Sequence, residues 1–142
     1  EGIRMGVPGK GYWISYFTGI DFRGDGNGIG LSTAGRAWAK ECRFYNWKTA
    51  VLGYGSVWTN VTDCVFEDNG IGFHFNARDS EYVASDTHFT GNEFTGNDTA
   101  VFLEAVPTDV KMDFGQCVFT DNGADIDNPD QQPIDITQAI FQ

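Results

Sequence analysis

The sequence predicts an all-β fold, a parallel solenoid of about six turns with three short strands in each turn. Three observations support this prediction: a recurring phenylalanine, strand-like alternation inside each repeat, and an unusual composition. Eighteen Gly and 15% aromatic residues in a chain of 142 residues are typical of short strands joined by tight turns. The length suits a single domain, so residues 1–142 are treated as one solenoid domain.

The recurring phenylalanine sets the period of the repeat. It stands at Phe22, Phe44, Phe66, Phe94, Phe119 and Phe141, with spacings of 22, 22, 28, 25 and 22 residues. Three positions after it, several repeats carry an asparagine, as at Asn69, Asn97 and Asn122. A period of this length indicates a solenoid in which equivalent residues of successive turns stack in columns.

Alternation within each repeat predicts strands and not helices. The residues five and seven positions before each Phe, such as Phe17 and Ser15, alternate with polar residues and mark the inward face of a strand. A further apolar position about seven residues after the Phe, such as Val51, indicates another strand. Helical and leucine-rich repeats need a 3.6-residue period in each unit, so they are excluded. A β-sandwich or barrel is the alternative, although it does not explain the register of the columns.

Two segments carry a resemblance to a known family. Residues 63–73 (DCVFEDNGIGF) and 116–123 (QCVFTDNG) resemble the right-handed parallel β-helix, or pectate-lyase-like, superfamily, and the likeness extends over nearly the whole chain. The resemblance implies a right-handed coil and an internal asparagine ladder at Asn69, Asn97 and Asn122. It also implies that ligands lie along the outward face of the strand preceding the Phe strand. It does not fix the chemistry, because the family includes lyases, hydrolases, esterases, tailspikes and adhesins.

The outward positions of that preceding strand form the predicted ligand surface. Aromatic rings can pack on the C–H groups of sugars, while charged and amide side chains bind hydroxyls or uronates. The surface starts aromatic and ends acidic, which favours a polysaccharide lying along the solenoid. The predicted substrate-binding residues are Tyr16, Arg36, Trp38, Lys40, Trp58, Asn60, Lys111 and Asp135.

A catalytic site on the same face is the alternative hypothesis. Asp86 and Asp113 are expected on neighbouring turns about 8 Å apart, a separation that suits an acid–base pair admitting water, with His88 between them. This arrangement suggests a glycoside hydrolase, or a polysaccharide lyase acting on a pectin-like uronic acid polymer. The sequence motifs that mark pectate lyases and polygalacturonases are missing, so a binding role is preferred over catalysis.

The composition disfavours several classes of partner and cofactor. The net charge of −11 disfavours nucleic acid and anionic membranes, and no apolar run is long enough for membrane insertion. No metal site and no cofactor are expected; a calcium ion at residues 24–30 is the alternative. Cys42 and Cys64 fall on adjacent turns, and packing as free thiols is preferred over a disulfide.

The sequence therefore favours a secreted or cell-surface module, of the kind exported by bacteria, that binds polysaccharide or serves as a structural or adhesive segment. Neither end of the repeat shows a helix or polar segment that would cover the solenoid. Residues 1–142 are therefore expected to be a fragment of a longer solenoid or multidomain surface protein, and another chain or domain is an expected partner at the ends.

Overall fold

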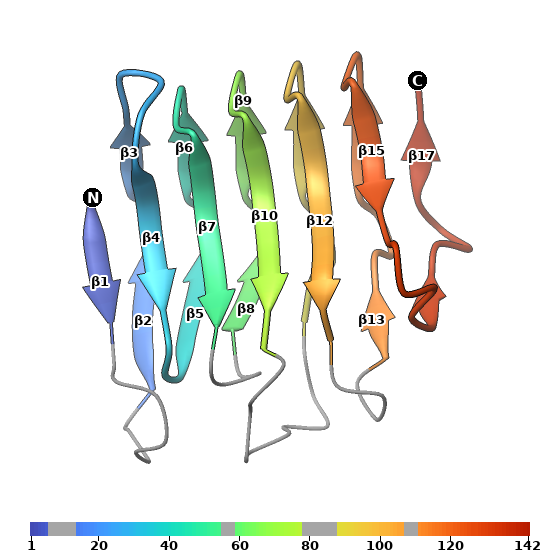
Figure 1. Cartoon of the computed structure of the whole chain (residues 1–142), viewed down its shortest axis with the longest axis horizontal. Helices are drawn as coiled ribbons and strands as arrows, with labels where there is room; N and C mark the ends of the chain where they lie inside the picture. Colours follow the sequence, from blue (N-terminus) through green and yellow to red (C-terminus); the bar gives the residue numbers. More distant parts are fainter. Residues whose placement is uncertain (6–13, 55–58, 78–87, 107–110) are drawn as a thin grey trace.

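The computed structural model describes residues 1–5, 14–54, 59–77, 88–106 and 111–142. Every regular element among these residues is a β-strand, and the strands pair in parallel with equivalent strands of neighbouring turns. In Figure 1 the chain advances from the N-terminus to the C-terminus while the near strands run down and the far strands run up, which makes the coil right-handed. The fold is thus the predicted parallel β-solenoid.

Three sets of strands form the walls of the solenoid. The long-strand sheet contains β1 (Ile3–Met5), β4 (Ile29–Thr33), β7 (Thr49–Tyr54), β10 (Ile71–Asn76), β12 (Thr99–Ala105) and β15 (Ala124–Asp127). The Phe sheet contains β3 (Asp21–Arg23), β6 (Arg43–Tyr45), β9 (Val65–Glu67), β11 (Glu93–Thr95), β14 (Val118–Thr120) and β17 (Ile140–Phe141). The third wall consists of the ring sheet, β2 (Ser15–Thr18), β5 (Ala37–Lys40) and β8 (Thr59–Thr62), followed by the pair β13 (Met112–Asp113) and β16 (Ile134–Asp135).

The phenylalanine column lies inside the solenoid, as predicted. Neighbouring rings of this column are stacked, with centroids 4.6 to 5.1 Å apart and planes within 10° of parallel. This spacing follows from the separation of about 4.8 Å between paired strands. Phe44, Phe66 and Phe119 are fully buried, whereas Phe141 at the end of the column is 46% exposed.

The structure corrects two details of the predicted repeat. The solenoid has about five turns and not six, because the six strands of each long sheet are separated by five full turns of the chain. The third-strand column is also shifted in the first turn: Leu31 pairs with Val51, while Ile29 pairs with Thr49. The loop between β3 and β4 is two residues longer than its counterparts, which moves Ile29 out of the expected position.

The asparagine ladder is present and saturated with hydrogen bonds. Asn69 Oδ1 accepts from the amide of Trp47 at 2.9 Å, and its Nδ2 donates to the carbonyl of Phe44 at 3.1 Å. Asn97 and Asn122 repeat the pattern one and two turns later. Each amide thus satisfies backbone groups that a corner would otherwise bury without partners.

Two corners of each turn use the left-handed backbone conformation. The residues concerned have φ between 52° and 71° and form two columns, Gly19, Glu41, Asp63, Gly91 and Gln116 at one corner and Asn46, Asp68, Gly96 and Asp121 at the other. Gly, Asn and Asp adopt this conformation most readily, which explains the Asp at positions 68 and 121 and the Gly at position 96. At Gly96 a Cβ atom would lie 2.8 Å from Oδ1 of Asp68, so the glycine also leaves room for the carboxylate of the preceding turn.

The three cysteines are buried free thiols, as predicted. Cys64 Sγ accepts a hydrogen bond of 3.4 Å from the amide of Cys42 in the adjacent turn. Cys117 Sγ donates to the carbonyl of Phe89 at 2.9 Å, and burial raises the pKa of this thiol to about 11. A thiol in such surroundings stays protonated and packs as a small apolar side chain.

Candidate functional site

The ring sheet presents the predicted surface with the predicted register. Tyr16 pairs with Trp38 and Trp38 with Asn60 on β2, β5 and β8. The backbone ladder continues to the next turn, where the amide of Val61 donates to the carbonyl of His88 at 2.9 Å. Four successive turns therefore place Tyr16, Trp38, Asn60 and His88 in one column, because side chains of a strand alternate between its faces.

Three of these side chains form a row of stacked rings. The ring centroids of Tyr16 and Trp38 are 6.3 Å apart with planes at 29°, and those of Trp38 and His88 are 5.3 Å apart with planes at 10°. Trp38 and His88 are two turns apart, so their rings lean toward each other across the turn that carries Asn60. Trp38 Nε1 supports this position by donating to Thr62 Oγ1 on β8 at 2.9 Å. We call Tyr16, Trp38 and His88 the ring row.

Asn60 does not face solvent, and the expectation of an exposed amide there is wrong. The residue is 0% exposed because the rings of Trp38 and His88 approach each other over its turn. Its Oδ1 accepts from the amide of His88 at 2.8 Å, so it positions the backbone of the next turn. Among the described residues, Asn60 Nδ2 and the nearby Thr59 Oγ1 are buried without a hydrogen-bond partner.

The stacking also changes how a ligand would meet the rings. Trp38 turns one face toward Tyr16 and the other toward His88, so it does not offer a free flat platform. Tyr16 is 66% exposed and ends the row, which leaves its outer face open. A sugar chain would therefore contact the outer face of Tyr16 and pass along the edges of the other two rings.

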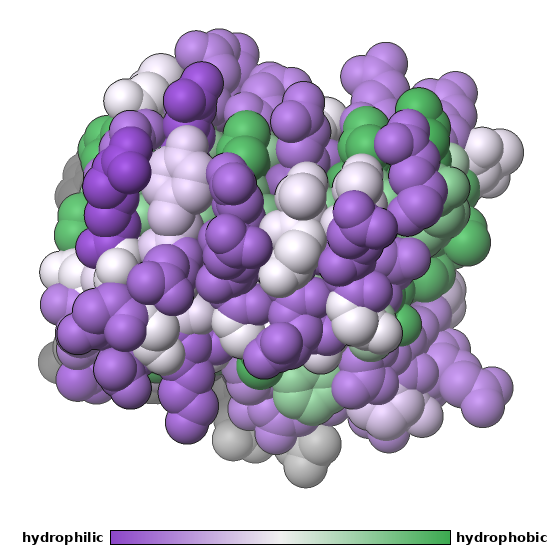
Figure 2. Space-filling view, turned by 90° about the horizontal axis from the view of Figure 1, so that it is seen from above, coloured by the Kyte–Doolittle hydropathy of each residue, from purple (hydrophilic) through white to green (hydrophobic). Residues whose placement is uncertain are grey.

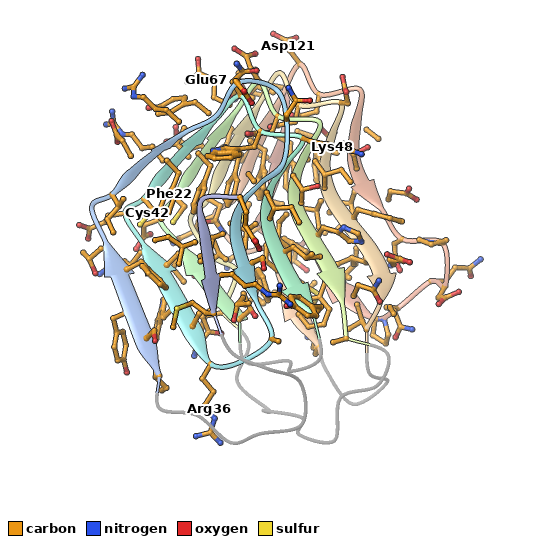
Figure 3. The ribbon with its side chains drawn as sticks, turned by 60° about the vertical axis from the view of Figure 1, so that its left-hand side comes forward. Phe22, Arg36, Cys42, Lys48, Glu67 and Asp121 are labelled. Carbon is orange, nitrogen blue, oxygen red and sulfur yellow. The ribbon has the colours of Figure 1, made fainter. Side chains whose placement is uncertain are left out.

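Two cationic side chains flank the ring row on β5 and just before it. Arg36 and Lys40 are both exposed, and the ammonium of Lys40 lies 3.5 Å from the carboxylate of Glu41. Figure 3 shows Arg36 pointing away from the body of the solenoid at the lower corner of the ring sheet. The strongly acidic chain thus has two positive groups close to Trp38, within reach of a ligand that follows the row.

The predicted acidic end of the surface lies on β13 and β16, and its carboxylates are largely engaged in local contacts. Asp113 and Asp135 pair on β13 and β16, and Asp113 Oδ1 accepts from the amide of Gly115 at 2.8 Å. Asp135 accepts from the hydroxyl of Thr137 at 2.7 Å and from Lys111 Nζ at 3.1 Å. The hydrogen bonds from Thr137, followed by that from Lys111, lower the pKa of Asp135 to about 2. This carboxylate is therefore held ionised and does not serve as an acid near neutral pH.

Two predicted residues, Asp86 and Trp58, lie outside the described residues. Of the proposed catalytic group the structure describes only His88 and Asp113, both exposed. Asp113 is occupied by its own turn through Gly115, and His88 stacks on Trp38. The described part of the group therefore shows side chains held by structural contacts.

Sequence reasoning missed a second surface feature, at the corner between the Phe sheet and the long-strand sheet. Two adjoining hollows of about 340 and 500 Å³ share Trp47 as a lining residue. Lys48, Asp68 and Asp98 line the first hollow, and Asp25 lines the second. The signal was present in the sequence, since Trp47 interrupts the column that carries asparagine in later turns.

No group of three or more metal-ligating side chains is found in the part of the chain that the structure describes. A search of the described residues for a helix long and apolar enough to cross a membrane also finds none. No family model matches the chain, and neither the curated proteins nor the solved structures contain a match.

Proposed function

We propose that the chain is a secreted or cell-surface β-solenoid module, of the pectate-lyase-like kind, that binds a linear polysaccharide along the ring sheet. The observation that carries this proposal is the ring row, in which Tyr16, Trp38 and His88 from three turns stack in line on an outward face. A straight row parallel to the solenoid axis matches a straight polymer better than a compact small ligand.

The exposure of the ring row supports a binding role. Tyr16 is the most exposed of the large hydrophobic residues found exposed in the described chain, and removal of its ring from water by a ligand would be favourable. Aromatic side chains also lose little conformational entropy when they bind, because they have few rotatable bonds. Tyr16 is therefore the expected centre of the binding energy.

The flanking charges favour a ligand with hydroxyl or carboxylate groups. Arg36 and Lys40 provide several N–H donors beside Trp38, and a guanidinium pairs well with a carboxylate or with adjacent hydroxyls. The pair Lys111 and Asp135 is joined at 3.1 Å in an exposed position, so it contributes little beyond the shape of the surface.

The alternative activity, a polysaccharide lyase or glycoside hydrolase, depends on Asp86 together with His88 and Asp113. Asp113 already accepts a hydrogen bond from Gly115, and Asp86 lies outside the described residues. Binding is therefore the function that the described geometry supports best.

Affinity electrophoresis through gels containing single polysaccharides tests the binding proposal. Retardation by at least one linear polysaccharide, acidic or neutral, is expected for the unmodified chain. Tyr16→Ala should lower the affinity by about 1–3 kcal/mol, the range for a stacking ring. Tyr45→Ala, which removes a half-buried ring from the Phe sheet, is the matched control and should leave retardation unchanged. Equal retardation of Tyr16→Ala and the unmodified chain would exclude the ring row as the binding site.

A further inference from the structure

The corner above the asparagine ladder carries a groove that the ring row does not explain. Its two hollows have volumes of about 340 and 500 Å³ and meet at Trp47. The first hollow extends over residues of successive turns, from Gly26 through Asn46 and Asp68 to Gly96. At a spacing of about 4.8 Å per turn, this extent corresponds to roughly 14 Å along the solenoid axis.

At the start of the ladder the groove is lined by Trp47, which stands where later turns carry an asparagine. Trp47 Nε1 donates to the carbonyl of Phe22 at 3.2 Å, the same role that Asn69 Nδ2 has one turn later. A Cβ atom at Gly24 would lie 2.6 Å from the Trp47 ring, and one at Gly30 would lie 3.2 Å from it. The indole therefore fits only beneath glycines, and the longer loop between β3 and β4 leaves space on both sides of it.

Three charged side chains in the groove have no partner among the described residues. The ion pairs and side-chain hydrogen bonds of the described residues involve none of the side chains of Lys48, Asp68 and Asp98, although all three line one hollow. Figure 2, which looks onto this corner, shows a mainly hydrophilic surface along the solenoid. Unpaired donors and acceptors beside an aromatic ring are the combination that fixes polar ligands in protein sites.

The charge of the groove selects among such ligands. Its acidic side chains, at Glu1, Asp25, Asp68 and Asp98, outnumber the cationic side chains of Arg23 and Lys48. Uronates, sulfated sugars and phosphates would meet like charges here, in a chain whose net charge is already −11. Sugar hydroxyls, in contrast, donate hydrogen bonds to carboxylates, and charge-assisted hydrogen bonds of this kind are the stronger ones.

We propose that this corner groove is a second saccharide site, which binds a short linear oligosaccharide without charged groups next to Trp47. The carboxylates of Asp68 and Asp98 accept hydrogen bonds from sugar hydroxyls, Lys48 donates one, and the exposed part of the Trp47 ring packs on a sugar C–H face. The site goes beyond the ring row, because Figure 3 shows Lys48 and Arg36 at opposite corners of the cross-section. One molecule could then hold two polysaccharide chains at once.

Titration calorimetry with cellohexaose, mannohexaose and hexagalacturonate tests the corner groove. At least one of the neutral hexamers should bind, and the double variant Asp68→Asn/Asp98→Asn should weaken that binding about tenfold or more. Asparagine keeps the side-chain shape and tolerates the left-handed conformation of Asp68, as Asn46 does in the preceding turn. Asp127→Asn, an exposed carboxylate outside the groove, should change nothing.

Tyr16→Ala separates this proposal from the function proposed for the ring row. The affinity for the neutral hexamers should be unchanged in Tyr16→Ala and lower in Asp68→Asn/Asp98→Asn. This expectation holds whether or not the ring row binds a polysaccharide. No binding of either neutral hexamer, loss of their binding in Tyr16→Ala, or equal affinity of the double variant would overturn the corner site. Tighter binding of hexagalacturonate than of the neutral hexamers at the groove would also overturn it, and circular dichroism must show that both variants are folded.

Discussion

Two stacks of rings run along this solenoid, one inside and one outside, and they differ in regularity. The inner stack has a phenylalanine in every turn, with centroid spacings of 4.6 to 5.1 Å and nearly parallel planes. The outer ring row has spacings of 6.3 and 5.3 Å and skips the turn that carries Asn60. The inner stack is therefore set by the strand spacing alone, whereas the outer row depends on which side chains can lean across a gap.

The inner stack stabilises the fold, whereas the outer ring row is available to ligands. The inner rings from Phe44 to Phe119 are fully or almost fully buried, so their burial stabilises the solenoid. Tyr16, in contrast, keeps most of its surface in water and contributes little to folding. Substitutions in the two stacks should accordingly change different properties, stability for the inner stack and binding for the outer row.

The largest expected effect is on the inner stack. Phe66→Ala removes a fully buried ring that stacks on Phe44 and Phe94, and the free energy of unfolding should fall by about 3–5 kcal/mol. Phe141→Ala removes a half-exposed ring from the end of the same stack and should lower it by less than about 1.5 kcal/mol. Urea unfolding followed by circular dichroism measures both. Equal losses at the two positions would contradict the description of a buried central stack.

The asparagine ladder should show the next largest effect. Asn97→Ala deletes the acceptor of the Asn69 amide and the donor to the carbonyl of Phe66, which leaves buried backbone groups unpaired. Each unsatisfied group costs about 1–3 kcal/mol, so a loss of about 2–4 kcal/mol is expected in the same unfolding measurement. Asn27→Ala, at an exposed position of the first-turn loop, is the control and should stay within about 0.5 kcal/mol. A loss at Asn97 no larger than at Asn27 would show that the ladder does not stabilise the corner.

The outer row should be nearly neutral for stability. Tyr16→Ala is expected to change the free energy of unfolding by about 0.5 kcal/mol or less, because the ring is 66% exposed. Its midpoint of thermal unfolding should match that of the unmodified chain within a few degrees. A strong destabilisation would mean that Tyr16 is part of the fold and that any loss of binding in this variant is indirect.

The smallest expected effect is a titration at the acidic end. Hydrogen bonds from Thr137 and then Lys111 lower the pKa of Asp135 from 3.8 to about 2. Since the folded-state pKa is depressed, the ionised group favours the folded chain above about pH 4, and this contribution is lost as pH falls from there toward 2. Carbon-detected NMR of the carboxyl group should show that Thr137→Val raises this pKa more than Lys111→Gln does. The reverse order would make the ion pair, and not the Thr137 hydroxyl, the main cause.

The inner columns could be predicted from the sequence because the same residue type recurs at equivalent positions of several turns. Phe66, Asn97 and Cys64 each have an equivalent residue in another turn, and strand spacing dictates that such residues stack. The ladder and the free thiols were confirmed for this reason. The register of the outward column from Tyr16 to Asn60 was also correct, since it follows from the same alternation.

The features that the sequence did not predict depend on side-chain contacts between turns, which a repeating sequence pattern does not reveal. Asn60 is buried because Trp38 bonds to Thr62 and leans over its turn, which alternation within one strand does not reveal. The corner groove is lined by Trp47, which interrupts the asparagine column, and by the loop between β3 and β4, which is two residues longer than its counterparts. Side-chain reach and loop length are set by three-dimensional packing, so the sequence pattern left them open.

The most direct test of a ligand-binding ring row is an NMR titration of the ¹⁵N-labelled chain with oligosaccharides from any polysaccharide that retards it in gels. The indole N–H of Trp38, bonded to Thr62 at 2.9 Å, is a reporter inside the row. The account predicts saturable shifts of this signal and of the amides of Tyr16 and His88, with no comparable change at Tyr45 on the Phe sheet. Shifts that leave Tyr16, Trp38 and His88 unchanged while the polysaccharide binds elsewhere would contradict it.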